Sequence, residues 1–332
     1  MKKELSKRQV RTTAQRRRKR RKKSKSFLRR LLQFFVFVFL IVLAYVGYVL
    51  YEAYEASRSS YVELERGKQS KLRDHSVRIA DDPVSILILG GEDYATDGEN
   101  GRTDTIMLAT LNPYSQSMKL LSIPRDTHLE IVGMDREDKV NHAHVFGGTE
   151  MVIATIEQFL EIPIDYFIKM NFDGFIGIID ELGGVTVDVP FDFSEKTTKK
   201  GEKAYFTKGP MHLNGEEALA YARMRKQDPR GDFGRNDRQK QVLKASIEQA
   251  LTVSTIFKVD KIAELLGDNI QTNLKPTEIL ALQQKYANFD TDWIDTLTLE
   301  GADHYENGIY YFIPSETSLE SVKIHLRVHL DL

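Results

Sequence analysis

One short segment of the sequence interleaves arginine with aspartate: YARMRKQDPRGDFGRNDRQ (residues 221–239) holds five arginines among three aspartates. Two other segments, GRTDTIML (101–108) and SIPRD (122–126), each place an arginine close to an aspartate. The guanidinium group is a planar, permanently charged fork that binds phosphate oxygens two at a time. Several such forks from separate segments therefore indicate a site for a doubly charged phosphate group, such as a pyrophosphate. A solvated charged surface is the alternative.

Two aspartates stand where predicted strands meet loops, Asp93 in LGGEDY and Asp104 in GRTDTIML. Mg²⁺ is usually held by one or two carboxylates together with substrate oxygens and water. Asp93 and Asp104 therefore form a candidate site for Mg²⁺ (or Mn²⁺) beside the phosphate. Simple ion pairing of these aspartates with Arg102 or Arg125 is the alternative, and the two arrangements are compatible.

The elements that must position these residues alternate between strand-like runs and helical patterns. Apolar runs predict strands at 85–90, 105–111, 118–123, 165–170, 293–301 and 308–314. The first of them is continuously apolar and is expected at the centre of a sheet. Capping signals and periodicity predict helices over 151–160, 172–182, 214–223 and about 236–252, with two more after Pro276 and at the C-terminus. This alternation is typical of a layered, mixed α/β domain.

The predicted elements determine on which side of a strand or helix the arginine side chains lie. Arg223 and Arg225 are two residues apart, so an extended segment points both the same way. Arg235, Arg238 and Gln239 fall at i, i+3 and i+4, on one face of the first turn of the long helix. A helix N-terminus favours anions through its free N–H groups and dipole. The pattern therefore predicts a funnel for an anion.

Charge is distributed unevenly along the chain, although the formal net charge is −1. Residues 1–30 hold 16 Lys and Arg against one acid, residues 31–50 hold no charged side chain, and the remainder holds 31 basic and 47 acidic residues. This uncharged stretch of 20 residues, in which Gln33 is the one polar side chain, is long enough to span the roughly 30 Å core of a bilayer. The positive-inside rule then keeps the basic tail in the cytoplasm and places residues 51–332 outside.

The predicted organisation is a basic cytoplasmic tail at 1–30, a transmembrane helix at 31–51, a linker at 52–82 and an extracellular domain at 83–332. A cleaved signal peptide is disfavoured, because the apolar region is long and no good small-x-small cleavage site follows it. A tail that binds nucleic acid is a further alternative. Basic runs beside a membrane span are, however, more often topology determinants and contacts with anionic lipids.

Several chemical classes are excluded or disfavoured by what the sequence lacks. It contains no cysteine, which excludes thiolate chemistry and cysteine-based metal sites. It also contains no G-x-S-x-G motif and no Ser-His-Asp order of the kind that hydrolases use. Phosphate chemistry based on arginine and aspartate is what remains.

Nine stretches occur in the order in which one family of envelope proteins carries them: ILGGED, GRTDTIML, LNP, LLSIPRDT, KVNHAHVFGG, IPIDYFIKMNFDGF, IDELGGVTVDVP, LNGEEALAYARMR and GDFGRNDRQ. They cover roughly residues 84–245. The chain thus resembles the LytR-CpsA-Psr family, including its basic tail and single membrane span. The resemblance implies a three-layer α/β/α sandwich with a mixed central sheet and a hydrophobic tunnel for a lipid tail.

The resemblance also implies an activity on the outer face of the membrane of a Gram-positive cell. The expected enzyme is a membrane-anchored phosphotransferase that moves an anionic glycopolymer from polyprenyl pyrophosphate to peptidoglycan, forming a phosphodiester at the muramic acid 6-hydroxyl. Teichoic acid, capsule and related wall polysaccharides are the candidate polymers. The expected partners are this lipid-linked polymer, peptidoglycan and the bilayer through residues 31–51, with no nucleic acid.

Site residues carry over from the family by position. Asp93 and Asp104 are the expected metal ligands, and the expected pyrophosphate ligands are Arg102, Arg125, Arg223, Arg225, Arg235 and Gln239. Arg238 matches the family's RQ pair and is either a further pyrophosphate ligand or a structural residue. The lipid tunnel has candidate lining residues on two predicted helices, with core packing as the alternative for each: Val152, Ile156, Phe159, Phe175, Ile176 and Ile179.

In phosphoryl transfer the protein contributes mainly by positioning the reactants and by stabilising charge in the transition state. Arg102 and Arg125 are the predicted catalytic arginines, and Asp126 and Asp232 are the candidates for the base that takes the proton of the acceptor hydroxyl. Loss of one transition-state donor, as in Arg125→Ala, is expected to cost more than ~100-fold in activity.

Two other functions stay open on the sequence. A polyprenyl-pyrophosphate hydrolase would use the same residues with water as acceptor. A membrane-bound transcriptional attenuator is disfavoured because the arginine-rich module is expected outside the cell. Residues 246–332 carry no motif tied to chemistry and are interpreted as scaffold, with an acceptor surface as the alternative.

Overall fold

The computed structural model describes residues 60–91, 101, 103–251, 269–287, 289 and 291–332. All of them belong to one of two compact units of the chain, Glu55–Leu332. The predicted tail (1–30) and membrane span (31–51) lie outside the described residues, as do Asp93 and Arg102. Among the described helices, none is both long and apolar enough to cross a bilayer.

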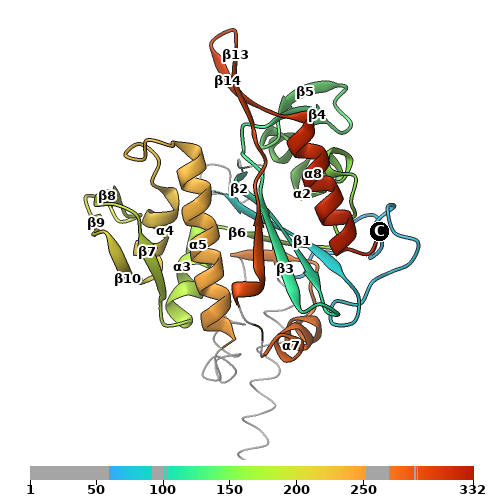
Figure 1. The fold of residues 1–332 in the computed structure, drawn as a ribbon, viewed down its shortest axis with the longest axis horizontal. Coiled ribbons are helices and arrows are strands. Elements are labelled where there is room, and N and C mark those ends of the chain that lie inside the picture. The colour runs from blue at the N-terminus through green and yellow to red at the C-terminus, as the bar shows by residue number, and fades with distance from the viewer. Residues whose placement is uncertain (1–59, 92–100, 102, 252–268, 288, 290) are drawn as a thin grey trace, which may run out of the picture. The chain divides into compact units, whose positions relative to one another are not determined.

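A six-stranded mixed sheet forms the centre of the domain, in the order β11-β6-β1-β2-β3-β12 (Figure 1). β1 pairs in parallel with β6, and β3 with β12, whereas β2 is antiparallel to both of its neighbours. This confirms the predicted α/β class with a mixed central sheet. The strands are β1 (Val84–Gly91), β2 (Thr103–Asn112), β3 (Ser117–Ser122), β6 (Tyr166–Met170), β11 (Ile270–Thr272) and β12 (Ile294–Leu297).

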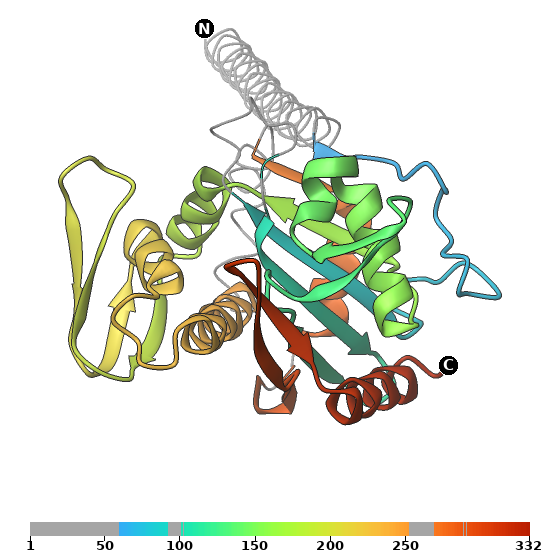
Figure 2. The ribbon, with the colours of Figure 1, turned by 90° about the horizontal axis from the view of Figure 1, so that it is seen from above.

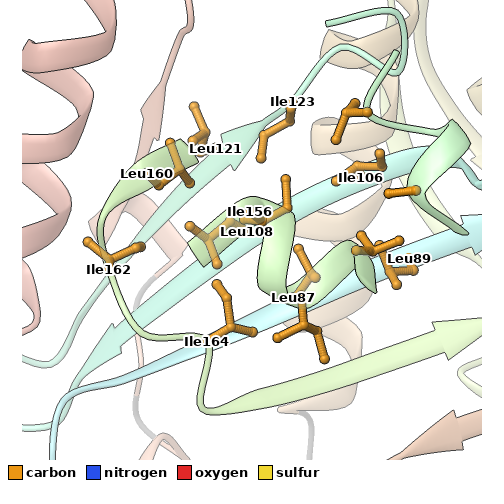
Figure 3. Packing of buried hydrophobic residues seen from close by; sticks show 14 of the residues in the cluster. Leu87, Leu89, Ile106, Leu108, Leu121, Ile123, Ile156, Leu160, Ile162 and Ile164 are labelled. Atoms are coloured by element: carbon orange, nitrogen blue, oxygen red, sulfur yellow. The ribbon is translucent and has the colours of Figure 1, made fainter. Parts of the chain in front are cut away.

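One face of the sheet is covered by two helices, α2 (His142–Leu160) and α8 (Glu316–His329). Alternate strand residues point to the same face, and Leu87 and Leu89 of β1 and Ile106 and Leu108 of β2 pack together with Ile156 of α2 (Figure 3). Each of these side chains is at most 2% exposed. Burial of each contributes about 1.5–3 kcal/mol, so this layer holds the sheet rigid behind the site.

The opposite face is covered by α5 (Asp232–Ala250) and α7 (Pro276–Lys285). Ile86 and Ile88, the other set of β1 side chains, pack with Ile247 of α5. The sequence places the start of α5 at about residue 236, but the helix begins four residues earlier. Gly231 precedes it with φ 58°, a backbone conformation that glycine adopts at little cost.

A smaller layered unit lies beside the sheet (Figure 2). It consists of α3 (Phe172–Glu181), α4 (Gly215–Arg223) and two antiparallel strand pairs, β7 (Val185–Val189) with β10 (Gly209–Leu213) and β8 (Phe193–Lys196) with β9 (Lys203–Phe206). Its own core is built around the stacked rings of Phe193, Phe206 and Tyr221. The helix predicted over 214–223 is confirmed, and Asn214 and Glu217 exchange hydrogen bonds in a capping box at its start.

Two further hairpins stand at one end of the sheet: β4 (His128–Ile131) with β5 (Arg136–Lys139), and β13 (Gly301–Glu306) with β14 (Ile309–Pro314). A short 3-10 helix, η3 (Thr291–Trp293), precedes β12. The tip of the β13–β14 hairpin projects beyond its neighbours in Figure 1. Its base is fixed to the chain after β3, because Thr127 and Phe312 form an isolated parallel bridge.

Residues 60–82, indicated by the sequence as linker, form no named strand or helix, yet they pack on the domain. Leu64 and Ile79 are 4% and 3% exposed. Arg73 Nη2 lies 2.7 Å from Asp165 Oδ2, and both side chains are buried. This part of the segment therefore follows the surface of the domain.

Candidate functional site

The loop after β3 brings Arg125 back to the start of β2. Arg125 Nη1 donates to Asp104 Oδ1 at 2.6 Å. Burial lowers the pKa of Arg125, but the carboxylates of Asp104, Asp126 and Asp232 outweigh it, and the net shift is upward. The guanidinium is thus firmly charged and is surrounded by carboxylates from three segments.

Asp126, next in sequence, accepts from Lys139 Nζ of β5 at 2.6 Å. Its second oxygen lies 3.5 Å from Arg125 Nε. One carboxylate therefore links the loop after β3 to the β4–β5 hairpin and fixes the direction of Arg125. Lys139 was not among the predicted site residues.

Asp232, the first residue of α5, lies between two arginines. Its Oδ2 is 3.2 Å from Arg225 Nη2, and its Oδ1 is 3.2 Å from Arg235 Nη2. Arg225 follows the end of α4 in an extended segment, with Met224 at φ −57° and ψ 132°. The two arginines therefore reach the same point from two elements.

Arg235 lies in this cluster with an unused donor. Its side chain is 8% exposed, and its Nε has no hydrogen-bond partner in the described part of the protein. Burial and the charges of Arg125 and Arg225 lower the pKa of Arg235. The carboxylates of Asp232 and Asp104 raise it, but the net shift is downward. An unsatisfied buried donor costs about 1–3 kcal/mol. An anionic ligand that accepts from Nε would remove this cost.

A cavity of about 340 Å³ opens beside the cluster. Its charged lining residues are Asp104, Arg223 and Arg235, and its other polar ones are Thr105, Asn171, Gln239 and Ser246. We call the part at Asp104, Arg223, Arg235 and Gln239 the polar end of the cavity. Most of the other lining residues are apolar, among them Ile88, Met107, Phe172, Phe175, Leu219 and Val242. Such a cavity accommodates a molecule with an anionic head and an apolar tail.

Two contacts define the polar end of the cavity. Gln239 Nε2 donates to Thr105 Oγ1 at 3.0 Å and ties α5 to β2. The guanidinium of Arg223 lies 4.5 Å from the ring centroid of Phe172, at the start of α3. A cation above an aromatic face is held in orientation by the ring quadrupole.

Arg238 is part of a different arrangement. It is 2% exposed, and its Nε donates to Tyr221 O at 3.1 Å, Nη1 to Asp228 Oδ2 at 2.5 Å and Nη2 to Met224 O. Burial raises the pKa of Asp228, but the Arg230 amide and the Arg238 guanidinium outweigh it and lower the pKa. We call this set, Arg238 with Asp228, Tyr221 and Met224, the arginine knot.

The profile described as the LytR_cpsA_psr family matches residues 47–327 of the chain. The chain belongs to this family. It is 52% identical over 277 residues to the polyisoprenyl-teichoic acid–peptidoglycan teichoic acid transferase TagV of Bacillus subtilis (82% of this chain, 71% of that protein). It is 45% identical to the transferase TagU of Halalkalibacterium halodurans (81% and 86%).

Solved structures of LytR-CpsA-Psr proteins share the fold. The crystal structure of B. subtilis TagV matches with a TM-score of 0.69 at 52% identity, covering 76% of this chain and 98% of that one. YwtF (TagT) with bound octaprenyl pyrophosphate lipid matches with a TM-score of 0.65 at 31% identity, covering 82% and 100%. TagT bound to LI-WTA gives a TM-score of 0.69 at 33% identity.

The structure of this family member brings most of the predicted site residues together. The residues that meet around the cluster and the polar end of the cavity are Asp104, Arg125, Asp126, Arg223, Arg225, Asp232, Arg235 and Gln239. Arg238 points into the knot, which corresponds to the structural alternative. Asp93 and Arg102 lie outside the described residues.

The two candidate helices for the lipid tunnel differ. Phe175 and Ile179 of α3 line the cavity, whereas Ile176 is not among its lining residues. On α2, Val152 and Ile156 belong to the main core, as Phe159 does at its edge. For α2, core packing is therefore the correct interpretation.

Proposed function

We propose that the protein transfers a teichoic acid or related anionic glycopolymer from polyprenyl pyrophosphate to peptidoglycan, forming a phosphodiester at the muramic acid 6-hydroxyl. The observation that carries this proposal is the unpaired Arg235 Nε in an arginine cluster at the polar end of an apolar cavity. The names of the relatives and the lipid and teichoic acid ligands of TagT support the same donor and acceptor.

In this proposal the cavity receives the part of the prenyl chain next to the pyrophosphate. Arg223, Arg225, Arg235 and Gln239 bind the pyrophosphate oxygens, together with Arg125, which pairs with Asp104. Each buried methylene of the chain contributes about 0.8 kcal/mol, while the arginines fix the position of the phosphorus. Affinity and orientation thus come from separate parts of the site.

The reaction is an in-line displacement. The acceptor hydroxyl attacks the sugar-side phosphorus, a new P–O bond forms, and the bond to polyprenyl phosphate breaks. The hydroxyl proton passes to Asp126 or Asp232, the two carboxylates beside Arg125. Arg125 and Arg235 stabilise the negative charge that accumulates on the departing phosphate.

A divalent cation fits the donor chemistry of the site. Asp104 is 42% exposed and lies at the polar end of the cavity, and one or two carboxylates are the usual protein share of an Mg²⁺ site. Asp104 would hold the ion together with Asp93. When bound, Mg²⁺ (or Mn²⁺) neutralises charge on the phosphate oxygens. Arg125 already shields Asp104 Oδ1 and keeps that carboxylate oriented.

Residues 31–51 are proposed to anchor the protein in the membrane, with the basic tail inside the cell and the catalytic domain outside. Support comes from the uncharged stretch of 20 residues and from the 16 basic residues before it. The donor lipid and the enzyme would then occupy the same bilayer, which raises the frequency of their encounter.

The test uses the full chain in detergent with a synthetic polyprenyl-pyrophosphate-linked oligosaccharide, Mg²⁺ and uncrosslinked peptidoglycan chains. Mass spectrometry should find sugar phosphate attached to the glycan. Arg125→Ala should lower the rate more than ~100-fold. Arg327→Ala is the matched control, because Arg327 is half exposed on α8 and distant from the cluster.

Each other outcome points to one alternative. Free sugar phosphate without attachment would indicate a hydrolase. No cleavage of the lipid pyrophosphate by the folded wild type would contradict an enzymatic role and favour a regulator.

A further inference from the structure

A second, much smaller pocket touches the arginine cluster from the side of the β13–β14 hairpin. Its volume is about 10 Å³, close to that of one water-sized group. It lies between Asp126 and Asp232 on one side and Tyr310 and Phe312 of β14 on the other. The two candidate bases therefore line this pocket, whereas the apolar cavity touches Asp104 and Arg235.

The two pockets share no lining residue, so they offer separate places for the two substrates. In-line transfer requires the acceptor oxygen to enter opposite the departing polyprenyl phosphate. Because the apolar cavity is suited to the lipid, the small pocket is the matching place for the acceptor hydroxyl. Anything attached to that hydroxyl must then lie along the hairpin.

The base of the hairpin is held against the cluster. The Phe312 amide donates to Asp126 O at 2.9 Å. The Phe312 ring is 1% exposed and meets the Phe233 ring of α5 edge-on at 5.8 Å. An isolated two-stranded hairpin is marginally stable in water, so these contacts give it a defined position relative to Asp126.

One face of the hairpin leads from the pocket outward. Asp303 pairs with Phe312, and Tyr305 pairs with Tyr310, so these four side chains share that face. The Tyr305 and Tyr310 rings meet at 5.5 Å, and Tyr310 Oη donates to Asp303 Oδ1 at 2.9 Å. Burial raises the pKa of Tyr310, and the hydrogen bond to Asp303 is the second cause of the increase. The hydroxyl group of Tyr310 therefore stays protonated.

The composition of the hairpin decides which substrate it suits. Residues 301–314, GADHYENGIYYFIP, contain two acids and no lysine or arginine. Carboxylates repel a polyanionic glycopolymer, so the hairpin does not suit the donor polymer. Tyr305 is 68% exposed although it is large and partly apolar. Tyrosine faces stack on sugar rings, and carboxylates accept hydrogen bonds from sugar hydroxyls, which together suit a glycan strand.

We propose that the face of the β13–β14 hairpin formed by Asp303, Tyr305 and Tyr310 binds the peptidoglycan glycan strand and guides one of its hydroxyls into the pocket between Asp126 and Asp232. This proposal rests on the proposed function, because it assigns the acceptor of that reaction to a surface. Tyr305 and Asp303 act as positioning residues at some distance from the reacting atoms.

The test compares two exposed tyrosines on two hairpins. Tyr305→Ala should raise the KM for uncrosslinked glycan chains about tenfold, the scale of one lost aromatic contact. Its kcat and its affinity for the lipid-linked donor should stay unchanged. Tyr205→Ala, which removes a tyrosine that is 73% exposed on β9, is the matched control and should change none of these quantities.

A binding measurement separates this proposal from the proposed function. Calorimetry of the full chain in detergent with soluble glycan oligomers should show binding that Tyr305→Ala weakens about tenfold, whether or not the wild type transfers polymer. Equal glycan affinities for Tyr305→Ala and Tyr205→Ala would overturn the hairpin as acceptor surface. Weaker binding of the donor by Tyr305→Ala would assign the hairpin to the donor polymer and also overturn it. Glycan binding without transfer by the wild type would overturn only the proposed function.

Discussion

Arg235 and Arg238 lie one helical turn apart on α5, both are buried, and each contacts an aspartate, yet their hydrogen bonding differs. All three nitrogens of Arg238 donate within the arginine knot. Arg235 shares Asp232 with Arg225 and has an unpaired Nε at the cavity. A saturated guanidinium supports the fold, whereas an unsaturated one is available to a ligand. For these two neighbouring arginines, hydrogen bonding therefore distinguishes the roles that burial alone does not.

The largest expected effect is on stability and concerns the knot. Arg238→Ala leaves the buried Asp228 carboxylate with only the more distant Arg230, whose Nε is 3.6 Å away, and loss of one member of a buried pair costs about 3–5 kcal/mol. Urea denaturation should show this decrease in the free energy of unfolding. Arg327→Ala should change it by less than about 1 kcal/mol. A small effect for Arg238→Ala would remove the contrast between the two arginines.

Arg235→Ala should show the opposite profile. It removes a donor to the pyrophosphate, so the transfer rate should fall at least ~100-fold. The free energy of unfolding should change little, because the variant also removes an unsatisfied donor and the repulsion from Arg125 and Arg225. Transfer assays and urea denaturation on the same samples check both parts. Near-wild-type transfer would exclude Arg235 from the binding site.

Gly234→Ala tests how tightly the knot is enclosed. A Cβ at position 234 would lie 1.8 Å from Asp228 Oδ2, so the carboxylate must move away from Arg238. The expected loss of stability is about 2 kcal/mol. In an Asp228→Ala background the same substitution should cost clearly less, because the clashing carboxylate is gone. Equal costs in both backgrounds would show that the clash with Asp228 is not the cause.

The smallest expected effect is the pH dependence of the knot. The pKa of Asp228 is lowered in the folded state, so the unfolded chain binds this proton first as the pH falls. Asp228 therefore contributes fully to the free energy of unfolding above the unfolded pKa of about 4, and this contribution is lost as the pH falls below that value. Between pH 5 and 3, the free energy of unfolding of the wild type should decrease more steeply than that of Asp228→Asn. The same pH dependence in both proteins would contradict a lowered pKa of Asp228 in the folded state.

The sequence predicts the site better than it predicts the role of each arginine. The spacing of Arg235, Arg238 and Gln239 places all three on one side of a helix, but Arg238 and Gln239 are still about 100° apart around its axis. Gln239 reaches Thr105 of β2, whereas Arg238 turns to the end of α4. Which of them faces the cavity depends on where α4 packs, and helical periodicity does not contain that information.

Two residues at the site, Lys139 and Tyr310, are not indicated by the sequence pattern. Lys139 contacts Asp126 from β5, and Tyr310 lines the pocket beside Asp126 from β14; neither lies in the segments that carry the arginine–aspartate pattern of the site. Their place depends on the pairing of β4 with β5 and of β13 with β14. By contrast, the strand at 85–90 was predictable in type and position, because its continuous apolar run is stable only between two other strands.

The size of the apolar cavity limits the length of prenyl chain that the enzyme contacts. Since about 10–15 Å³ of such volume holds one water-sized group, and a methylene is of similar size, the volume of about 340 Å³ admits on the order of five isoprene units. The rest of a long prenyl chain extends past the cavity. Selection among lipid carriers therefore depends on the pyrophosphate and on these units, so chain length beyond them has little influence, and donors shortened to about this length should still be used.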